Sequence, residues 1–279
     1  MGDKMANSSS FRPPMLCQEV KSTELDNFTN GGWIAQDKID GVRAVLYVQT
    51  DGSVVVQGRR KFITHRYPEL QRAFPIGCDY VLDAEVCTKD EIFNHLQYRE
   101  QNNNPFKVSL LSGLHPCKVM VFDILELNGV PLVNKPLFER LKILKDTVIP
   151  NDTVFVLDVF KGSEIKERFE RATKMNKEGI VIKQEGSNYI YGKRSPHWLK
   201  CKTWFEATVN VSSYEVNPAG ITCSNVSGFR VQVAGKNSEP VRSAIDANGS
   251  VDIEIQYLEL TKNGCYRMPT FKRLAGSEA

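Results

Sequence analysis

Residues 38–43 read Lys-Ile-Asp-Gly-Val-Arg, and this stretch indicates more about the fold than any other six residues of the chain. An amine that attacks a phosphorus atom must be held rigidly and have its pKa lowered, because lysine ordinarily titrates near about 10.4. Asp40 can orient the ammonium group of Lys38, and Gly41 permits a tight backbone turn beside it. Arg43 can direct a planar set of N–H donors at phosphate or sugar oxygens. Taken alone, the stretch also fits a strand end followed by a turn with solvated charges.

Four further short motifs follow in order along the chain. They are VLDAEV at Val81–Val86, VFDIL at Val121–Leu125, EGIVIK at Glu178–Lys183 and WLKCK at Trp198–Lys202. With residues 38–43 they resemble, in type and in order, the successive motifs of the ATP-dependent DNA ligases. The resemblance extends from about Pro13 to Arg273, and five motifs in the family's order make a strong signal where each alone is weak.

The chain of 279 residues is long enough for two domains, and strand patterns outnumber helix patterns in its N-terminal part. A hairpin turn is expected at Asp51-Gly52. Strands are expected at Trp33–Lys38, Val42–Val48, Asp79–Val86, Cys117–Leu125, Thr153–Phe160 and Gly179–Lys183. Helices are expected from a capping box at Thr88–Glu91 to about Gln101, and at Pro136–Lys145 and Ser163–Met175. This order predicts an α+β domain with mainly antiparallel sheets around a nucleotide cleft.

The resemblance implies that residues 13–203 form a nucleotidyltransferase (adenylation) domain of ATP-grasp-like type, preceded by a disordered tail at residues 1–12. From Phe205 onward, short strand patterns are separated by Gly, Asn, Pro and Ser, and no long helix is expected. Apolar and polar residues alternate over Val251–Tyr257, which is typical of a half-buried strand. We therefore expect residues 204–279 to form a small all-β OB-fold barrel.

Composition narrows the class of protein. The net charge is only +3, so any affinity for DNA must come from local basic clusters. The seven cysteines are scattered singly with no Cys-x-x-Cys pair, which argues against a disulfide framework and a zinc module. The NAD-dependent ligases carry a zinc module and extra domains, so ATP is the expected cofactor. No apolar run has the length of a bilayer span and residues 1–10 are polar, so we expect a monomeric cytoplasmic protein without a membrane partner.

The nucleophile is expected to be Lys38, which would form a lysyl–AMP adduct from ATP. A lysine is a poor nucleophile at neutral pH unless nearby cations or Mg²⁺ lower its pKa. Lys200 and Lys202 alternate along one strand and so share a face, from which they can reach the phosphate. The other interpretation of these two lysines is a solvent-facing edge strand.

A slot for the adenine base is implied by the resemblance. Phe122 would stack on one face of the base and Val181 on the other, although core packing alone also explains both residues. Gln36 or Asp37 would meet the adenine edge, and the sequence does not choose between them. Lys183 and Arg43 complete the expected nucleotide contacts.

Two carboxylates are candidate metal ligands. Glu85, two residues after Asp83, can accept a ribose hydroxyl or hold a metal ion. Glu178 begins a buried strand, where an unpaired charge is costly, and a bridging Mg²⁺ or Mn²⁺ removes that cost. A salt bridge from Glu178 to a nearby lysine is the alternative.

Several arginines are expected to contact the phosphate groups of DNA and of ATP. Arg59, with Arg60 beside it, falls where the family grips the 5′-phosphate, and Arg194 is a further candidate contact to DNA. Arg267 and Arg273 lie in a stretch that resembles the family's final motif, which orients the pyrophosphate leaving group. The family usually continues with a second arginine and an acid, where this chain has Ala275 and Ser277.

The resemblance thus implies an ATP-dependent DNA ligase that seals 5′-phosphate/3′-hydroxyl nicks in duplex DNA through lysyl–AMP and an adenylylated 5′ end. Without a DNA-binding domain before Pro13, we expect modest, salt-dependent nick affinity. Three alternatives stay open. An RNA ligase shares the nucleophile loop, and an mRNA-capping guanylyltransferase usually shows Asp-Gly where this chain has Glu178-Gly179. The third is a non-catalytic OB-type nucleic-acid binder.

Overall fold

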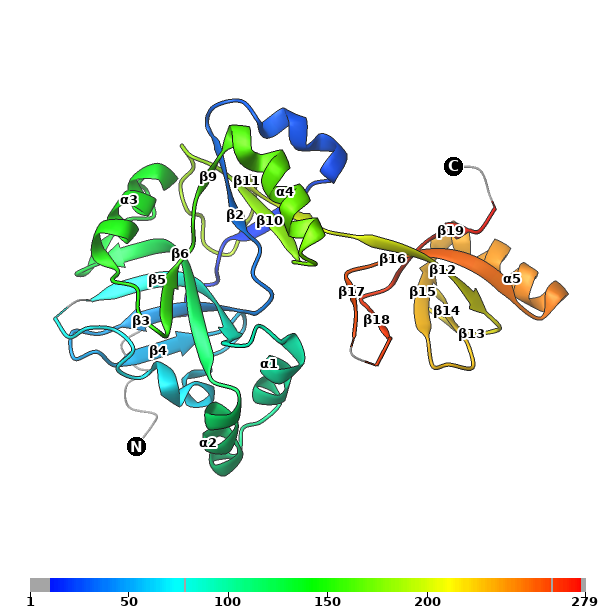
Figure 1. Ribbon diagram of the computed structural model, residues 1–279, viewed down its shortest axis with the longest axis horizontal. Helices are drawn as coiled ribbons and strands as arrows, with labels where there is room; N and C mark the ends of the chain where they lie inside the picture. The colour runs from blue at the N-terminus through cyan, green and yellow to red at the C-terminus, as the bar shows by residue number, and fades with distance from the viewer. Residues whose placement is uncertain (1–10, 78, 262, 277–279) are drawn as a thin grey trace. The chain divides into compact units, whose positions relative to one another are not determined.

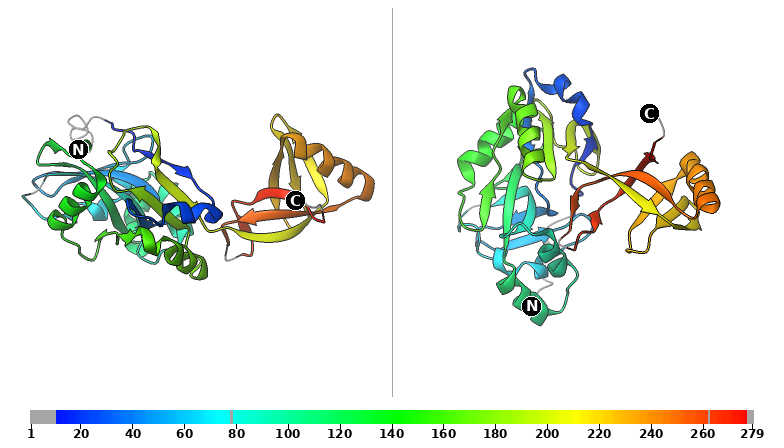
Figure 2. Two further views of the ribbon diagram at one scale, coloured as in Figure 1. Left: turned by 90° about the horizontal axis from the view of Figure 1, so that it is seen from above. Right: turned by 45° about the vertical axis from the view of Figure 1, so that its right-hand side comes forward.

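The computed structural model describes residues 11–77, 79–261 and 263–276. The chain divides into two compact units, Met1–Cys201 and Lys202–Ala279 (Figures 1 and 2). Within the described ranges, no helix has the length and apolar character needed to cross a membrane.

Part of the expected N-terminal tail lies outside the described residues, as do Cys78 and Ser277. Of residues 1–12, only Phe11 and Arg12 are described. The backbone N–H of Arg12 donates to the side chain of Gln57 over 2.9 Å, and its guanidinium lies 2.8 Å from the Glu126 carboxylate. Arg12 is thereby attached to the folded unit.

The N-terminal unit contains two sheets. The first has six strands, in the order β4-β3-β5-β6-β7 with β8 paired to β6. Val48 pairs with Val54 across an antiparallel hairpin, and Gly52 in its turn has φ +81°, which glycine adopts without strain. The expected strand at Val42–Val48 and the hairpin at Asp51-Gly52 are therefore confirmed. The bounds are β3 Val42–Val48, β4 Val54–Gln57, β5 Tyr80–Thr88, β6 Cys117–Leu127, β7 Val130–Pro131 and β8 Val154–Val156.

A five-stranded sheet, in the order β1-β11-β10-β2-β9, forms the other half of this unit. Helix α4 (Ile165–Lys174) lies against it (Figure 1) and buries Ile165 and Ala172 among Ala35, Ile180 and Ile182. The strand bounds are β1 Leu16–Glu19, β2 Trp33–Asp37, β9 Phe160–Lys161, β10 Gly179–Gln184 and β11 Arg194–Lys202. Of the strand pairs with a described register, β1–β11 and β6–β8 are parallel and the others are antiparallel, as the sequence predicts for most of the fold.

One apolar cluster joins the two sheets. It contains Ile34 and Trp198 from the five-stranded sheet and Val45, Val81 and Phe122 from the six-stranded sheet, all buried. Burying this much apolar surface between two sheets is the main source of their mutual stability. Helix α3 (Leu137–Thr147) covers the six-stranded sheet with Leu144 buried in a second cluster.

The helical segment between β5 and β6 corrects two expectations. The prediction that a helix begins with a capping box at Thr88–Glu91 is wrong. Thr88 still belongs to β5, and its hydroxyl donates to Asp90 over 2.7 Å. Helix α1 begins later, at Phe93, and ends at Glu100. A second helix, α2 (Pro105–Leu114), was missed although Asn104 caps it, accepting from the backbone N–H groups of Phe106 and Lys107.

The expected single strand at Thr153–Phe160 is also wrong. Its start, β8, pairs with β6, whereas its end, β9, pairs with β2 in the other sheet. The apolar pattern of this segment cannot reveal that it passes from one sheet to another, because its two halves have similar residues and differ only in the strands with which they pair.

The C-terminal unit contains two three-stranded sheets, β12-β16-β19 and β13-β14-β15, and a β17-β18 ribbon. Ile253 and Ile255 of β16 are fully buried, which confirms the alternating pattern there. The expectation of no long helix is wrong, since α5 (Ser238–Asn248) buries Val241 and Ile245 in this core. The bounds are β12 Phe205–Val211, β13 Ser213–Asn217, β14 Gly220–Ser224, β15 Arg230–Ala234, β16 Val251–Tyr257, β17 Glu259–Leu260, β18 Tyr266–Arg267 and β19 Thr270–Leu274.

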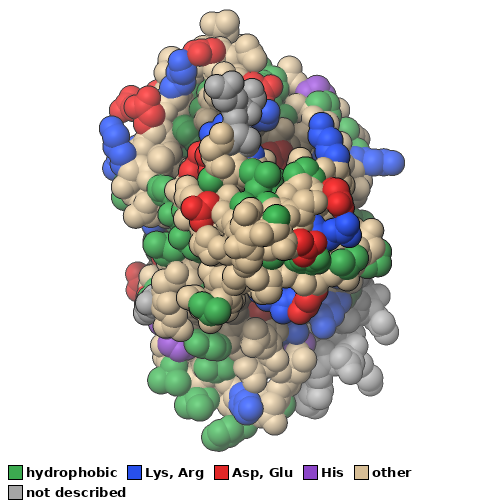
Figure 3. Space-filling view, turned by 90° about the vertical axis from the view of Figure 1, so that its right-hand side faces the viewer, with side chains coloured by type: hydrophobic (Ala, Val, Ile, Leu, Met, Phe, Trp, Pro, Cys, Tyr) green, Lys and Arg blue, Asp and Glu red, His purple; other side chains and the backbone are tan. Residues whose placement is uncertain are grey.

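Short 3₁₀ helices connect several of these elements. They are η2 Ser22–Phe28, η3 Thr64–Arg66, η4 Pro68–Leu70, η5 Gly162–Glu164 and η6 Gly235–Asn237. On the face drawn in Figure 3, basic and acidic side chains are interspersed among the described residues. This mixture agrees with the low net charge of +3.

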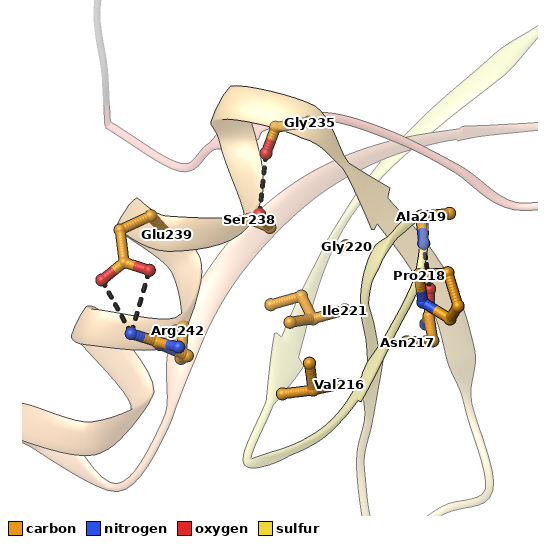
Figure 4. A pocket seen from close by; sticks show the side chains of 10 residues that line it. All are labelled: Val216, Asn217, Pro218, Ala219, Gly220, Ile221, Gly235, Ser238, Glu239 and Arg242. Carbon is orange, nitrogen blue, oxygen red and sulfur yellow. Dashed lines mark hydrogen bonds and ion pairs between the residues drawn. The ribbon is translucent and has the colours of Figure 1, made fainter.

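A cavity of about 360 Å³ lies in the C-terminal unit between the β13–β14 turn and the start of α5 (Figure 4). The one acidic and one basic side chain on its wall, Glu239 and Arg242, pair with each other at 3.0 Å. None of its lining residues is a site residue expected from the sequence.

Candidate active site

Residues 38–41 carry the chain from β2 in one sheet to β3 in the other, so Lys38 lies where the two sheets meet. The backbone N–H of Lys38 donates to the carbonyl of Gly179 over 3.0 Å, which continues the β2–β10 pairing. A side chain at Gly41 is excluded, because its Cβ would lie 2.4 Å from the Val86 carbonyl oxygen. Glycine is thus required here by the close approach of β5.

The Lys38 ammonium is paired with an acid. Its Nζ lies 2.6 Å from Oε2 of Glu178, the residue immediately before β10, and both side chains are largely shielded from solvent. The salt bridge that the sequence left open as the alternative for Glu178 is therefore present, and its lysine is Lys38 itself. The pair fixes the direction in which the amine points.

Glu85 projects from β5 toward the same charges. Burial raises its pKa to about 8, while the nearby cations Lys38 and Arg43 oppose this shift and the Glu178 carboxylate adds to it. No hydrogen bond or ion pair to Glu85 occurs among the described residues. Glu85 and Glu178 are therefore two carboxylates near one lysine, one of which has no partner.

Arg43 is held by Asp83, which lies two residues before Glu85 on β5. Its guanidinium makes a two-pronged bond to Asp83, with Nε–Oδ1 at 2.5 Å and Nη2–Oδ2 at 2.6 Å. Asp83 is fully buried and also accepts the Tyr189 hydroxyl over 2.6 Å. Burial alone lowers the pKa of Arg43, but the charge and hydrogen bonds of Asp83 raise it above its ordinary value. This rigid pair orients Arg43 in the site.

Phe122 is buried and packs against two cations. The Arg43 guanidinium is 4.6 Å and the Lys183 ammonium 4.5 Å from its ring centre, and the Trp198 ring meets it edge-on at 6.2 Å. Lys183 is 2% exposed, and burial lowers its pKa to about 8. The aromatic rings stabilise the buried ammonium through their electron-rich faces.

Near Phe122, two buried N–H groups lack an acceptor among the residues that the structure describes. The Gln36 amide oxygen accepts from Lys183 Nζ over 2.6 Å, but within residues 11–77, 79–261 and 263–276 neither Gln36 Nε2 nor Trp198 Nε1 has a partner. Buried donors without acceptors are rare in folded proteins and mark places where a ligand can supply the acceptor. Gln36 Nε2 and Trp198 Nε1 are therefore the two buried donors of this cluster that a ligand acceptor could satisfy.

Gln36 and Asp37, the two residues that the sequence left as alternatives for the adenine edge, have different partners. Asp37 is bound through both carboxylate oxygens by Arg168 of α4, with Nε–Oδ1 at 2.6 Å. The Arg168 guanidinium also lies 4.1 Å from the centre of the Phe160 ring. Asp37 thus attaches α4 to the sheet, whereas Gln36 accepts from Lys183.

The other strand residues occupy the positions that alternation predicts. Lys200 and Lys202 are half-buried on one face of β11, with the fully buried Cys201 between them on the other face. Lys200 Nζ is 3.3 Å from Glu19, and Lys202 Nζ is 5.1 Å from the centre of the Trp204 ring. Val181 on β10 is half-buried opposite Gln36 on β2.

Other expected residues lie elsewhere. Arg59 and Arg60 are exposed in the turn after β4, and Arg194 is exposed at the start of β11, where it binds the Cys17 carbonyl. In the C-terminal unit, Arg267 lies 2.9 Å from Glu259, and Arg273 lies 2.7 Å from Glu254. These two arginines are engaged within their own unit.

Sequence reasoning missed the groups that hold the site residues in place. Asp83 was considered only as a neighbour of Glu85, and Tyr189 and Arg168 were not considered. The signal for Asp83 was an acid inside a run of buried strand residues, since a buried carboxylate requires a cation or several donors. Nothing in the sequence near Tyr189 or Arg168 identifies their partners, which are 106 and 131 residues away.

Among known families, the model of the ATP dependent DNA ligase domain matches residues 14–202. The chain is also 30% identical to DNA ligase 1 of Methanosarcina mazei over 207 residues, which is 67% of this chain and 36% of that protein. The chain spans about a third of the length of the curated relatives it matches.

Solved structures share the fold. A structure from a study of DNA binding by Lig E DNA ligases superposes with a TM-score of 0.66 at 18% identity, covering 95% of this chain and 100% of that one. Mycobacterial DNA ligase D complexed with ATP and MES superposes with a TM-score of 0.59 at 19% identity, covering 96% of both chains. At this identity the likeness concerns the mixed α/β architecture with antiparallel sheets.

Proposed function

Because the chain belongs to the ATP dependent DNA ligase domain family, we propose that it joins DNA ends by way of an AMP adduct on Lys38. The observation that carries this proposal is the placement of Lys38 in the crossing between the two sheets, 2.6 Å from Glu178 and beside Glu85 and Arg43. An amine, two carboxylates and a fixed guanidinium around one slot are what nucleotide transfer requires.

ATP is the proposed nucleotide substrate. The unpartnered amide N–H of Gln36 and indole N–H of Trp198 can donate to acceptors of a base, and Phe122 and Val181 offer apolar surface to its faces. In the described conformation the Arg43 guanidinium and the Lys183 ammonium lie 4.6 and 4.5 Å from the centre of the Phe122 ring, close to where a base stacked on that ring would lie. Lys183, Lys200 and Lys202 supply positive charge for the phosphates.

A divalent cation, Mg²⁺ or Mn²⁺, fits Glu85 and Glu178. Glu85 is the unpartnered carboxylate whose pKa is raised by burial, so a cation beside it offsets the cost of its charge. Oxygen ligands of this kind suit Mg²⁺, which would neutralise phosphate charge. Glu178, freed from Lys38 when the amine reacts, would be the second ligand.

The proposed reaction has three transfers at one site. In the first, the Lys38 ammonium loses one proton through Glu178 to solvent, and its Nζ then forms a bond to the α-phosphorus while the bond to the pyrophosphate oxygen breaks. In the second, an oxygen of the DNA 5′-phosphate takes the AMP from Lys38. In the third, the 3′-hydroxyl attacks the 5′-phosphorus and AMP leaves. Each transfer depends on positioning and charge neutralisation more than on acid–base chemistry.

Finer features belong to the same proposal. Residues 13–203 would be the nucleotidyltransferase domain and residues 204–279 an OB-type domain that supplies Arg267 and Arg273 to the pyrophosphate. Arg59, Arg60 and Arg194 would contact the phosphates of a nicked duplex. We also propose a monomer in the cytoplasm, in keeping with the absence of disulfides among the described cysteines.

The experiment is a sealing assay on a nicked duplex with a 5′-phosphate, run with ATP and Mg²⁺ for wild type and Lys38→Ala. We expect sealing by the wild type only. Parallel substrates with RNA in either strand, and GTP in place of ATP, distinguish RNA joining and guanylyl transfer. Sealing that survives Lys38→Ala, or adduct formation with GTP alone, contradicts the proposal.

A further inference from the structure

A cluster of metal-binding side chains lies outside the nucleotide site. Asp90, His95 and His115 each place one ligand atom within 4.8 Å of the ligand atoms of the other two. They come from the helical segment between β5 and β6, which the proposed function does not use. We propose that these three side chains form a site for a divalent transition-metal ion such as Zn²⁺.

The carboxylate is already oriented. Oδ1 of Asp90 accepts the Thr88 hydroxyl over 2.7 Å and the Ile92 backbone N–H over 3.1 Å, while Oδ2 lies 2.6 Å from Nδ1 of His95. Hydrogen bonds that fix a carboxylate in this way are typical of the groups that support metal ligands. Oδ2 is thereby directed at the imidazoles.

The two imidazoles are close and suited to a shared ion. The rings of His95 and His115 stack with their centres 4.0 Å apart. A neutral imidazole offers a ring nitrogen with a lone pair, which is the form in which histidine binds metals. The hydrogen bond that Asp90 accepts from His95 explains the position of His95 but not that of His115, which an ion bound by all three would explain.

The ligand set selects the class of metal. Two imidazole nitrogens and one carboxylate oxygen favour Zn²⁺, Co²⁺ or Ni²⁺ over Mg²⁺ and Ca²⁺, which prefer oxygen ligands. Three protein ligands leave a position for water. The neighbouring cations do not oppose binding strongly, because Arg99 is paired with Glu69 and Lys118 with Glu91.

The site would close the base of the helical segment. Thr88 pairs with Cys117 across β5 and β6, and the N–H of Lys89 donates to the carbonyl of Pro116 over 2.8 Å, so residues 89–116 leave and re-enter the sheet at one place. Asp90 precedes α1, His95 lies on α1 and His115 follows α2. An ion held by all three therefore joins both helices to this base.

The test uses the full chain without nucleotide and with excess Mg²⁺ to occupy the Glu85 and Glu178 carboxylates. Co²⁺ is titrated while its visible absorption is recorded, and Zn²⁺ is then added in competition. We expect one Co²⁺ to bind wild type and be displaced by Zn²⁺, with binding at least about 10-fold weaker in Asp90→Asn, His95→Gln and His115→Gln. His65→Gln is the matched control, because His65 is exposed in the same unit and hydrogen-bonds Asn103 instead.

Hydrogen exchange of the wild type, with and without Zn²⁺, gives a readout that does not depend on the variants folding. We expect slower exchange in residues 89–116 when the ion is present. Absence of saturable Co²⁺ binding, equal binding by all four variants, or protection confined to other segments would overturn the proposal.

Discussion

At the scale of single residues, Glu85 has the carboxylate whose ionisation responds most to its surroundings. Its folded-state pKa of about 8 lies above the ordinary value of 4.5, so burial favours the neutral acid. The stability from this preference is complete below about pH 4.5 and is lost as the pH rises through about 8.

The substitution Glu85→Gln should therefore stabilise the folded protein, relative to wild type, by more as the pH rises. We expect the free energy of unfolding of the variant, relative to wild type, to rise by at least about 1 kcal/mol between pH 5 and pH 9 in the absence of divalent ions. Urea denaturation at several pH values measures this. Parallel pH profiles for the two proteins would show that Glu85 is an ordinary surface carboxylate.

Gly41 is the second residue with a specific consequence. A Cβ at this position would lie 2.4 Å from the Val86 carbonyl oxygen and 2.7 Å from Cγ of Glu85. Gly41→Ala should thus push β3 from β5, with a loss of about 1–3 kcal/mol in stability and a strong loss of AMP transfer to Lys38. Gly31→Ala is the control, because a Cβ there meets nothing within 4 Å. Equal thermal stability of the two variants would contradict the close approach.

At the scale of elements, one buried ion pair ties α3 to β6. Arg140 and Asp123 are both fully buried, with Nε–Oδ1 at 2.9 Å and Nη2–Oδ2 at 2.8 Å. Arg140 also donates to the Ser187 carbonyl over 3.0 Å, which attaches the loop after β10. This loop leads to Tyr189, the residue that bonds to Asp83.

Arg140→Met should leave the Asp123 charge buried without a partner. We expect a loss of about 3–5 kcal/mol in the free energy of unfolding, measured by chemical denaturation. Lys142→Ala, on the exposed side of α3, should change it by less than about 0.5 kcal/mol. If the two substitutions have similar effects, the ion pair does not hold α3 in place.

The helices and strands show which parts of the fold could be predicted from the sequence. Val42–Val48 was predicted to the residue because a largely apolar segment leads into a clear Asp-Gly turn. The helix predicted at Ser163–Met175 is present as Ile165–Lys174, because its apolar residues follow helical spacing. Helix α2 was missed although Phe106, Leu110 and Leu114 recur at helical spacing, and the structure leaves these three side chains 77%, 52% and 62% exposed. The segment β8–β9 was merged because only tertiary pairing separates its halves.

The candidate site was predictable where one motif carries the chemistry, as at Lys38, Glu85 and Glu178. The pairs that position these groups were not, since Arg43–Asp83 and Asp37–Arg168 join residues that are 40 and 131 positions apart. Whether Glu178 would meet a lysine was open in the sequence, and only the approach of β2 and β10 decides it.

At the scale of the whole molecule, the charge distribution predicts how DNA affinity responds to salt. With a net charge of +3, binding depends on a few phosphate contacts from local arginines and lysines. We expect the affinity for a nicked duplex to fall roughly 10-fold or more between 50 and 200 mM salt, measured by fluorescence anisotropy. Affinity that does not change over this range would exclude phosphate contacts as its main source.

The central claim is that the Lys38 amine becomes bonded to AMP. Intact mass spectrometry after incubation with ATP and Mg²⁺ tests it on wild type, Lys38→Ala and Lys174→Ala, whose lysine is exposed on α4 of the same unit. The account predicts a gain of one adenylate in wild type and Lys174→Ala and none in Lys38→Ala. An adenylate on Lys38→Ala, or none on the wild type, would contradict it.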